Sequence, residues 1–271
     1  MNSLASMSPR ELELLSQFIA KAKPPPILHR YRRVSPRAIE ELSAPEVHIA
    51  GIEDMNDPFE FRAPLAIDTE KLKALMFAHA REQLGMAQEA ARLEMLGIDQ
   101  SSVAYFNERI EEVRLASNLI CCSKDPRSNR MWAYYGDSHK GICIGYSTAY
   151  PPFSIAREVT YRDPDGSLDL LGTLEKDPTM LSDLVSCRKG AEWGFEQEFR
   201  IPIGPIPNDR TRLLPIAPEA IVEIRLGLKI PTEFRADVLA TARKLPRPPR
   251  IIQMGCDYDK FSFTEIEISA A

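Results

Sequence analysis

The sequence predicts an α+β fold, with a mixed or antiparallel central sheet, an N-terminal helix and a helical insertion near residues 69–117. Alternating apolar and polar residues recur in several short segments, which is typical of half-buried strands. Helical periodicity gathers in the first half of the chain instead of alternating with the strands, which argues against a parallel α/β sheet. We therefore expect a single α+β domain over residues 27–271, preceded by a helix and a proline-rich link over residues 1–26.

The individual elements are predicted from periodicity and from helix-capping and helix-breaking residues. Residues 1–26 form an amphipathic pattern that ends at three consecutive prolines. Ser35 and Pro36 begin a short helix, with Ser35 as its cap and Pro36 in its first turn. Two helical stretches make up the insertion, and a further helix is expected near residues 232–244. Strands are expected in the segments ILHRYRRV, SNLICCS, GICIGY, IAREVTYR, FEQEFRIPI, IVEIRLG, PRIIQMG and FSFTEIEI.

Composition and charge exclude several classes of protein. The net charge of −5 disfavours a broad electrostatic surface for nucleic acids, although a local basic patch remains open. No apolar run approaches the roughly 18 residues of a membrane-spanning helix, and the N-terminus lacks a signal-peptide pattern. The five cysteines are an odd number and contain no C-x-x-C pair, so we expect free thiols, no metal site and a cytoplasmic location.

The segment SNLICCSKDPRSNRMWAYYGDSHKGICIGY is the strongest candidate for the wall of a site. Two strand-like runs flank a polar stretch that also contains several aromatic residues, a mixture that suits a ligand pocket. Ser123 ends the first strand and Arg130 follows in the loop. Trp132 and Tyr135, three residues apart on a short helix, share one face and could stack on a planar ring. Packing of Trp132 into the core is the alternative interpretation.

A second candidate lies in WGFEQEFR, where apolar and charged residues alternate. This period of two predicts a strand with Glu196, Glu198 and Arg200 on one face. Neighbouring carboxylates repel each other, which raises the pKa of one of them and suits acid–base chemistry. The alternative is a solvated strand face on which Arg200 bridges the two acids.

Two further segments carry candidate residues. In the first predicted strand, His29 and Arg33 share one face while Arg30 and Arg32 share the other, where they could clamp a phosphate or be exposed. The NDPFE segment begins at Asn56 and has turn chemistry, so it is either a structural turn or a ligand-facing loop. The P-loop, the dinucleotide-binding glycine motif, the serine-hydrolase elbow and the HExxH motif are all absent from the sequence.

Taken together and in order, these motifs resemble the bacterial domain-of-unknown-function family 2971. The family pattern L-Y-K-Y corresponds to LHRY, F-N-D-P-F-E to MNDPFE, and W-x-x-E-x-E-x-R to WGFEQEFR. The pattern C-F-S…M-W-x-x-Y-A-x-x-H-x-G-x-C-I corresponds to CCSKDPRSNRMWAYYGDSHKGICI, and I-x-x-I-x-x-G to IVEIRLG. The resemblance covers the chain from about residue 27. Departures include His29 for the usual tyrosine, Tyr134 where the family often has His, and Gly136 for Ala.

The order of the motifs is also similar to that of ADP-ribosyltransferases. This likeness implies that Glu198 acts at the ribose, where cleavage of the nicotinamide–ribose bond develops oxocarbenium character. It also implies an arginine at the pyrophosphate of NAD and an aromatic stacking surface at its nicotinamide ring. The catalytic residues expected from it are Glu198, Glu196 and His29, and the NAD-binding residues are Arg30, Ser123, Arg130, Trp132, Tyr135 and Asn56.

Three hypotheses for the function follow. The first is an NAD-using ADP-ribosyltransferase-like enzyme or NAD glycohydrolase in bacterial defence or toxicity, with NAD as a co-substrate that is not tightly held and with an unidentified protein or nucleic-acid acceptor. The second is a non-enzymatic ligand- or partner-binding domain. The third is a metal-dependent enzyme that processes nucleotides or nucleic acids, in which Glu196 and Glu198 hold a divalent ion. None of the three involves a membrane.

Overall fold

A computed structural model describes residues 22–60, 117–162, 186–203 and 212–268, together with the isolated positions 13, 16, 20, 65–66, 111, 115 and 168–169. The predicted N-terminal helix over 1–26 and the predicted helical insertion over 69–117 lie almost entirely outside these described residues. The fold and the site are therefore built from the four long described ranges.

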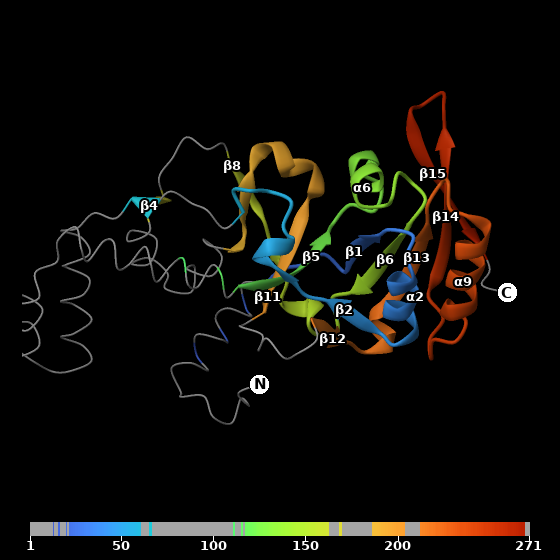
Figure 1. Ribbon diagram of the computed structural model, residues 1–271, viewed down its shortest axis with the longest axis horizontal. Helices are drawn as coiled ribbons and strands as arrows, with labels where there is room; N and C mark the ends of the chain where they lie inside the picture. The colour runs from blue at the N-terminus through green and yellow to red at the C-terminus, as the bar shows by residue number, and fades with distance from the viewer. Residues whose placement is uncertain are drawn as a thin grey trace, which may run out of the picture.

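The described residues form a mixed nine-stranded sheet, which confirms the predicted α+β class (Figure 1). The strand order is β15-β14-β13-β6-β1-β5-β11-β7, and β3 pairs with β5 off this path. Only β13 and β14 run parallel among these pairs; the others are antiparallel. The strands are β1 (Ile27–Arg32), β3 (Ala50–Gly51), β5 (Asn118–Ser123), β6 (Ile142–Ser147), β7 (Arg157–Glu158), β11 (Glu198–Ile203), β13 (Ile221–Leu226), β14 (Arg250–Asp257) and β15 (Ser262–Ile268).

Short elements surround the sheet. Three further strand pairs are β2 (Glu46–His48) with β12 (Leu213–Pro215), β8 (Thr160–Arg162) with β10 (Arg188–Gly190), and β4 (Leu65–Ala66) with β9 (Leu168–Asp169). The 3-10 helices are η2 (Ile52–Asp54), η3 (Phe153–Ile155), η4 (Ala191–Glu196) and η5 (Pro218–Ala220). Pairing of β8 with β10 brings η4 beside the end of β11, which positions one wall of the site.

Helices cover both faces of the sheet. The larger hydrophobic cluster packs beneath α2 (Pro36–Ser43) and α9 (Thr232–Ala242), which contact each other. The smaller cluster lies beneath α6 (Asn129–Tyr134), on the other side of the sheet (Figure 1). The predicted cap is confirmed, since the Ser35 hydroxyl accepts the Ala38 N–H at 3.2 Å.

Two strand predictions are only partly correct. The expected strand FEQEFRIPI begins at Glu198, because the residues up to Glu196 form η4 and Gln197 adopts a left-handed conformation with φ of 44°. Phe195 packs against the cluster beneath α6, so its alternation with Phe199 reflects two different packing partners. The expected strand IAREVTYR divides at Val159, whose N–H donates to Glu198; β7 then stays in the main sheet while β8 pairs with β10.

Candidate functional site

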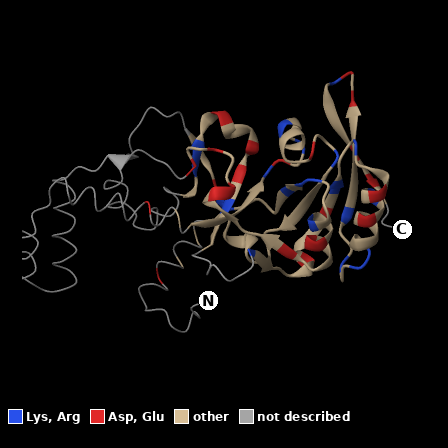
Figure 2. Ribbon diagram, viewed as in Figure 1, with Lys and Arg blue, Asp and Glu red and all other residues tan. Residues whose placement is uncertain are grey.

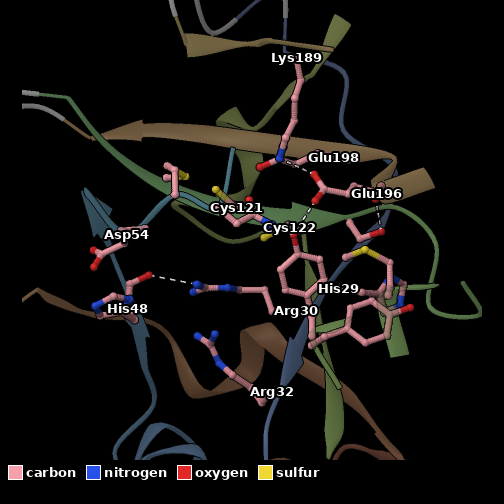
Figure 3. Close-up of a pocket in the computed structure, with 17 residues that line it drawn as sticks. His29, Arg30, Arg32, His48, Asp54, Cys121, Cys122, Lys189, Glu196 and Glu198 are labelled. Atoms are coloured by element: carbon pink, nitrogen blue, oxygen red, sulfur yellow. Dashed lines mark hydrogen bonds and ion pairs between the residues drawn. The ribbon is translucent and has the colours of Figure 1, made fainter. Parts of the chain in front are cut away.

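A cavity of about 360 Å³ lies where β1 and β5 diverge (Figure 3). The two strands pair only through His29 and Ser123, at the end of β5, while the start of β5 pairs with β3. The strands therefore part beyond His29, and the residues that follow β2 close the opening. A volume of this size is within the range of small-molecule sites.

Three predicted residues form one row across the sheet. His29 is the register partner of Ser123, and Ser123 is the partner of Glu198 on β11. Directly opposite residues of antiparallel strands point to the same face. All three are at least nine-tenths buried, and all three line the cavity. Sequence motifs that are far apart along the chain thus meet at one place.

The two glutamates share buried cations. Lys189 Nζ on β10 lies 2.7 Å from a Glu196 oxygen, 3.6 Å from Glu198 and 3.5 Å from Glu60. Arg200 donates to Glu198 at 2.8 Å and lies 2.6 Å from Glu60. Figure 3 shows Lys189 reaching toward Glu196 and Glu198 from one side of the cavity. The predicted bridge between Glu196 and Glu198 is made by Lys189 and not by Arg200, which links Glu198 to Glu60 instead. The alternative of a solvated strand face is wrong because the whole cluster is buried.

The environments of the two glutamates drive their pKa values apart. Burial and repulsion by Glu198 raise the pKa of Glu196 despite the contact with Lys189. Burial also acts to raise the pKa of Glu198, but attraction to Arg200 and Lys189 outweighs it and lowers the value to about 2. Glu198 is therefore ionised at neutral pH, while Glu196 takes up a proton more readily than an ordinary glutamate does. Such a division between neighbouring carboxylates is typical of acid–base sites.

Three residues that were predicted to bind a cofactor hold Glu196 in place. The Tyr135 hydroxyl donates to Glu196 Oε1 at 2.6 Å, and Asn56 donates to the Tyr135 oxygen at 2.5 Å. The Ser123 hydroxyl donates to the backbone carbonyl of Glu196 at 2.6 Å. Asn56, Ser123 and Tyr135 also line the cavity, so a bound ligand would contact them directly.

Trp132 and Arg130 do not line the cavity. Trp132 is 1% exposed and packs edge-on against Tyr31, with its indole N–H donating to the Pro126 carbonyl at 3.0 Å. The predicted stacking surface at Trp132 is therefore wrong and the core-packing interpretation is confirmed, because the helix turns this side chain into the core. Arg130 is exposed, with its guanidinium over the ring of Phe195. The phenol rings of Tyr31 and Tyr135 do line the cavity.

His29 is held by the carboxylate of Glu223 on β13, a strand on the side of β1 away from β5. Its Nε2 lies 2.9 Å from Glu223 Oε1, and its buried Nδ1 has no hydrogen-bond partner among the described residues. Burial acts to raise the pKa of Glu223, but hydrogen bonds from His29 and Arg225 lower it to about 2. Arg225 also contacts Glu265, which in turn accepts from Arg127. A chain of alternating charges thus runs from the cavity to the surface.

Sequence reasoning missed several residues of the site. Lys189 gave no signal because its position depends on the pairing of β10 with β8. Glu60 ends the NDPFE segment, and only the fold places it beside Arg200. His48, which no motif marked, completes the wall on the other side of the cavity together with Arg32.

The thiols at the cavity are not reactive nucleophiles. Burial raises the pKa of Cys121 well above its ordinary value and that of Cys122 to about 12, so both remain protonated. All five cysteines are free, as the sequence predicted. Within the described ranges, the His, Cys, Asp and Glu side chains form no group of three or more that could hold a metal ion. No helix among the described residues is long and apolar enough to cross a membrane.

Comparison of the chain with protein-family models, curated protein sequences and solved structures found no match. The fold and the site define an α+β protein with a buried, charged cavity in a divided sheet. The resemblance to the domain-of-unknown-function family and the likeness to ADP-ribosyltransferases stay predictions that rest on the motifs.

Proposed function

We propose that the protein is an NAD-using enzyme, either an ADP-ribosyltransferase-like transferase or an NAD glycohydrolase. The observation that supports this proposal best is the buried row of His29, Ser123 and Glu198, in which Glu198 stays ionised inside a ligand-sized cavity. Part of the proposal is a role in bacterial defence or toxicity, which comes from the family resemblance alone. The proposed cytoplasmic location comes from the cysteine content of the sequence.

The proposed reaction uses both glutamates. The bond between the ribose C1′ and the nicotinamide nitrogen breaks, and its electron pair leaves with nicotinamide. The Glu198 carboxylate stabilises the positive charge that develops on the ribose. A hydroxyl of water or of an acceptor then bonds to C1′ and gives its proton to Glu196, whose raised pKa suits a proton acceptor. The His29 Nδ1, which has no hydrogen-bond partner among the described residues, would bond a ribose hydroxyl in this proposal.

The metal-dependent alternative is less well supported by the same geometry. The ammonium of Lys189 already lies among the three carboxylates, and Arg200 contacts two of them. A divalent ion would have to displace or be repelled by these cations. Under the non-enzymatic alternative, the same cavity binds a ligand but the ligand is not converted.

The test is incubation of the purified protein with NAD, with release of nicotinamide measured by chromatography. We expect release by the wild type and a loss of roughly 100-fold or more in Glu198→Gln, because a neutral amide does not stabilise the oxocarbenium ion. Glu192→Gln is the matched control, since Glu192 lies on η4 and is exposed. Circular dichroism checks that both variants are folded.

Each outcome separates the hypotheses. Binding of NAD without turnover, with or without candidate acceptors, supports the non-enzymatic alternative. Activity on nucleotides or nucleic acids that EDTA abolishes supports the metal-dependent one. If the wild type neither binds nor consumes NAD, or if folded Glu198→Gln keeps full turnover, the proposed function is wrong.

A further inference from the structure

Two arginines of β1 lie on the apolar face of the sheet. Alternation along the strand puts Arg30 and Arg32 on the same face as Leu28, which belongs to the hydrophobic cluster beneath α2 and α9. Their register partners on β6 are Ile144 and Ile142, which belong to the same cluster. Figure 2 shows Lys and Arg, in blue, on strands of the sheet as well as on the outer helices. Arginine in such a place costs stability unless it is paired.

The charge of these arginines is only partly compensated. Arg32 Nε lies 2.6 Å from Glu41, but Glu41 is also 3.6 Å from Arg37. Arg30 is 7% exposed, and its Nη2 donates a hydrogen bond of 3.1 Å to the backbone carbonyl of His48. No carboxylate in the described ranges lies within ion-pair distance of Arg30. The group formed by Arg30, Arg32, Arg37 and Glu41 therefore carries more positive than negative charge.

Donor groups of both arginines remain unused. Arg30 Nη1 and Arg32 Nη2 are buried and have no hydrogen-bond partner among the described residues. Both side chains line the cavity (Figure 3), on the side opposite Lys189. The neighbouring His48 adds no charge, since burial and repulsion by Arg37, Arg30 and Arg32 lower its pKa to about 4. A buried cation with spare donors is complementary to an anion that the protein itself does not supply.

We infer that Arg30 and Arg32 form a subsite for a phosphate group of the ligand. Two guanidinium groups offer several fixed donors, which match the oxygens and the negative charge of a phosphoryl group. This inference deepens the proposed function by naming the charged group that the substrate must carry. The phosphate is held at the arginines, and the sugar then extends toward Glu196 and Glu198. A nucleoside without a phosphate lacks the group that the arginines bind.

The test measures the binding of ribose 5-phosphate, inorganic phosphate and unphosphorylated ribose by isothermal titration calorimetry. We expect the wild type to bind ribose 5-phosphate and inorganic phosphate, and to bind ribose at least about 10-fold more weakly than ribose 5-phosphate, since hydrogen bonds to charged groups are worth at least this factor. Arg30→Gln and Arg32→Gln should each weaken ribose 5-phosphate binding by about 10-fold or more. Arg33→Gln is the matched control, because Arg33 follows in the chain and is exposed.

A second variant, Arg30→Lys, separates loss of binding from loss of folding. Arg30→Lys keeps the charge but loses the planar fork, so we expect binding weaker than in the wild type and tighter than in Arg30→Gln. Equal binding of ribose and ribose 5-phosphate, or equal binding of ribose 5-phosphate by the wild type, Arg30→Lys and Arg32→Gln, overturns the subsite.

The outcomes for the subsite and for the proposed reaction are distinguishable. Arginine-dependent binding of ribose 5-phosphate by a protein that never cleaves NAD leaves the subsite standing and refutes the reaction. If the protein cleaves NAD and neither Arg30→Lys nor Arg32→Gln changes the KM for NAD, the proposed reaction stands and the phosphate subsite is refuted.

Discussion

Replacing Lys189 by Met removes the ammonium group that three buried carboxylates share. Nζ lies 2.7 Å from Glu196, 3.5 Å from Glu60 and 3.6 Å from Glu198. At an effective dielectric constant of about 20, a pair at the shortest of these distances attracts by about 6 kcal/mol before desolvation is subtracted. Removing one partner of a buried pair costs about 3–5 kcal/mol, because the other charge is left buried. We expect the free energy of unfolding at pH 7 to fall by about 3–5 kcal/mol.

The loss should become smaller as the pH falls. Without Lys189, the pKa of Glu196, which is already raised in the folded protein, rises further. A group with a raised folded pKa stabilises the folded state below its unfolded pKa, about 4.3 for glutamate, and this contribution is lost as the pH rises through the folded pKa. The variant is therefore closest to the wild type in stability near pH 5 and furthest from it at pH 7.

Urea unfolding at pH 5 and pH 7 measures both effects. With a slope of about 3 kcal/mol per molar urea, the midpoint should fall by roughly 1 M or more at pH 7. Lys140→Met is the matched control, since Lys140 is exposed. A loss below about 1 kcal/mol at pH 7, or the same loss at both pH values, would refute the assignment of Lys189 as the shared counter-ion.

Three further predictions concern other parts of the described structure. Tyr135→Phe removes the 2.6 Å hydrogen bond to Glu196, which raises the pKa of Glu196, so the acid limb of the pH–rate profile should move to higher pH; an unmoved limb contradicts the role of Glu196 as base. Glu223→Gln weakens the buried contact with Arg225 and should cost about 2 kcal/mol in urea unfolding, whereas an unchanged midpoint would show that the pair adds nothing. Phe261→Gly relieves a left-handed φ of 49° at a 98% exposed residue, so thermal unfolding should show a gain of about 1 kcal/mol; a lower melting temperature contradicts this.

Much of the fold could be predicted because local patterns report local structure. The period of two in ILHRYRRV predicted β1, and Ser35 with Pro36 predicted the start of α2. The same period misled at residues 195–197, where Phe195 and Phe199 pack against different clusters. An alternating pattern records which side chains are apolar, but it does not record which neighbour buries them.

The site was predictable to the extent that its residues lie in motifs. His29, Ser123 and Glu198 were identified from three separate segments, and strand register brings them into one row. Trp132 was misplaced, because an aromatic residue on a short helix has the same pattern whether it faces a ligand or the core.

The sequence by itself determined the α+β class, the positions of the principal strands and helices, and the residues of the central row. Only the tertiary structure decided the electrostatics of the site. Lys189 reaches the carboxylates through the pairing of β10 with β8, and Arg30 enters the cavity because β1 and β5 diverge after a single pair. The physical reason is that periodicity depends on neighbours along the chain, whereas burial and charge pairing depend on residues that are distant in sequence and close in space.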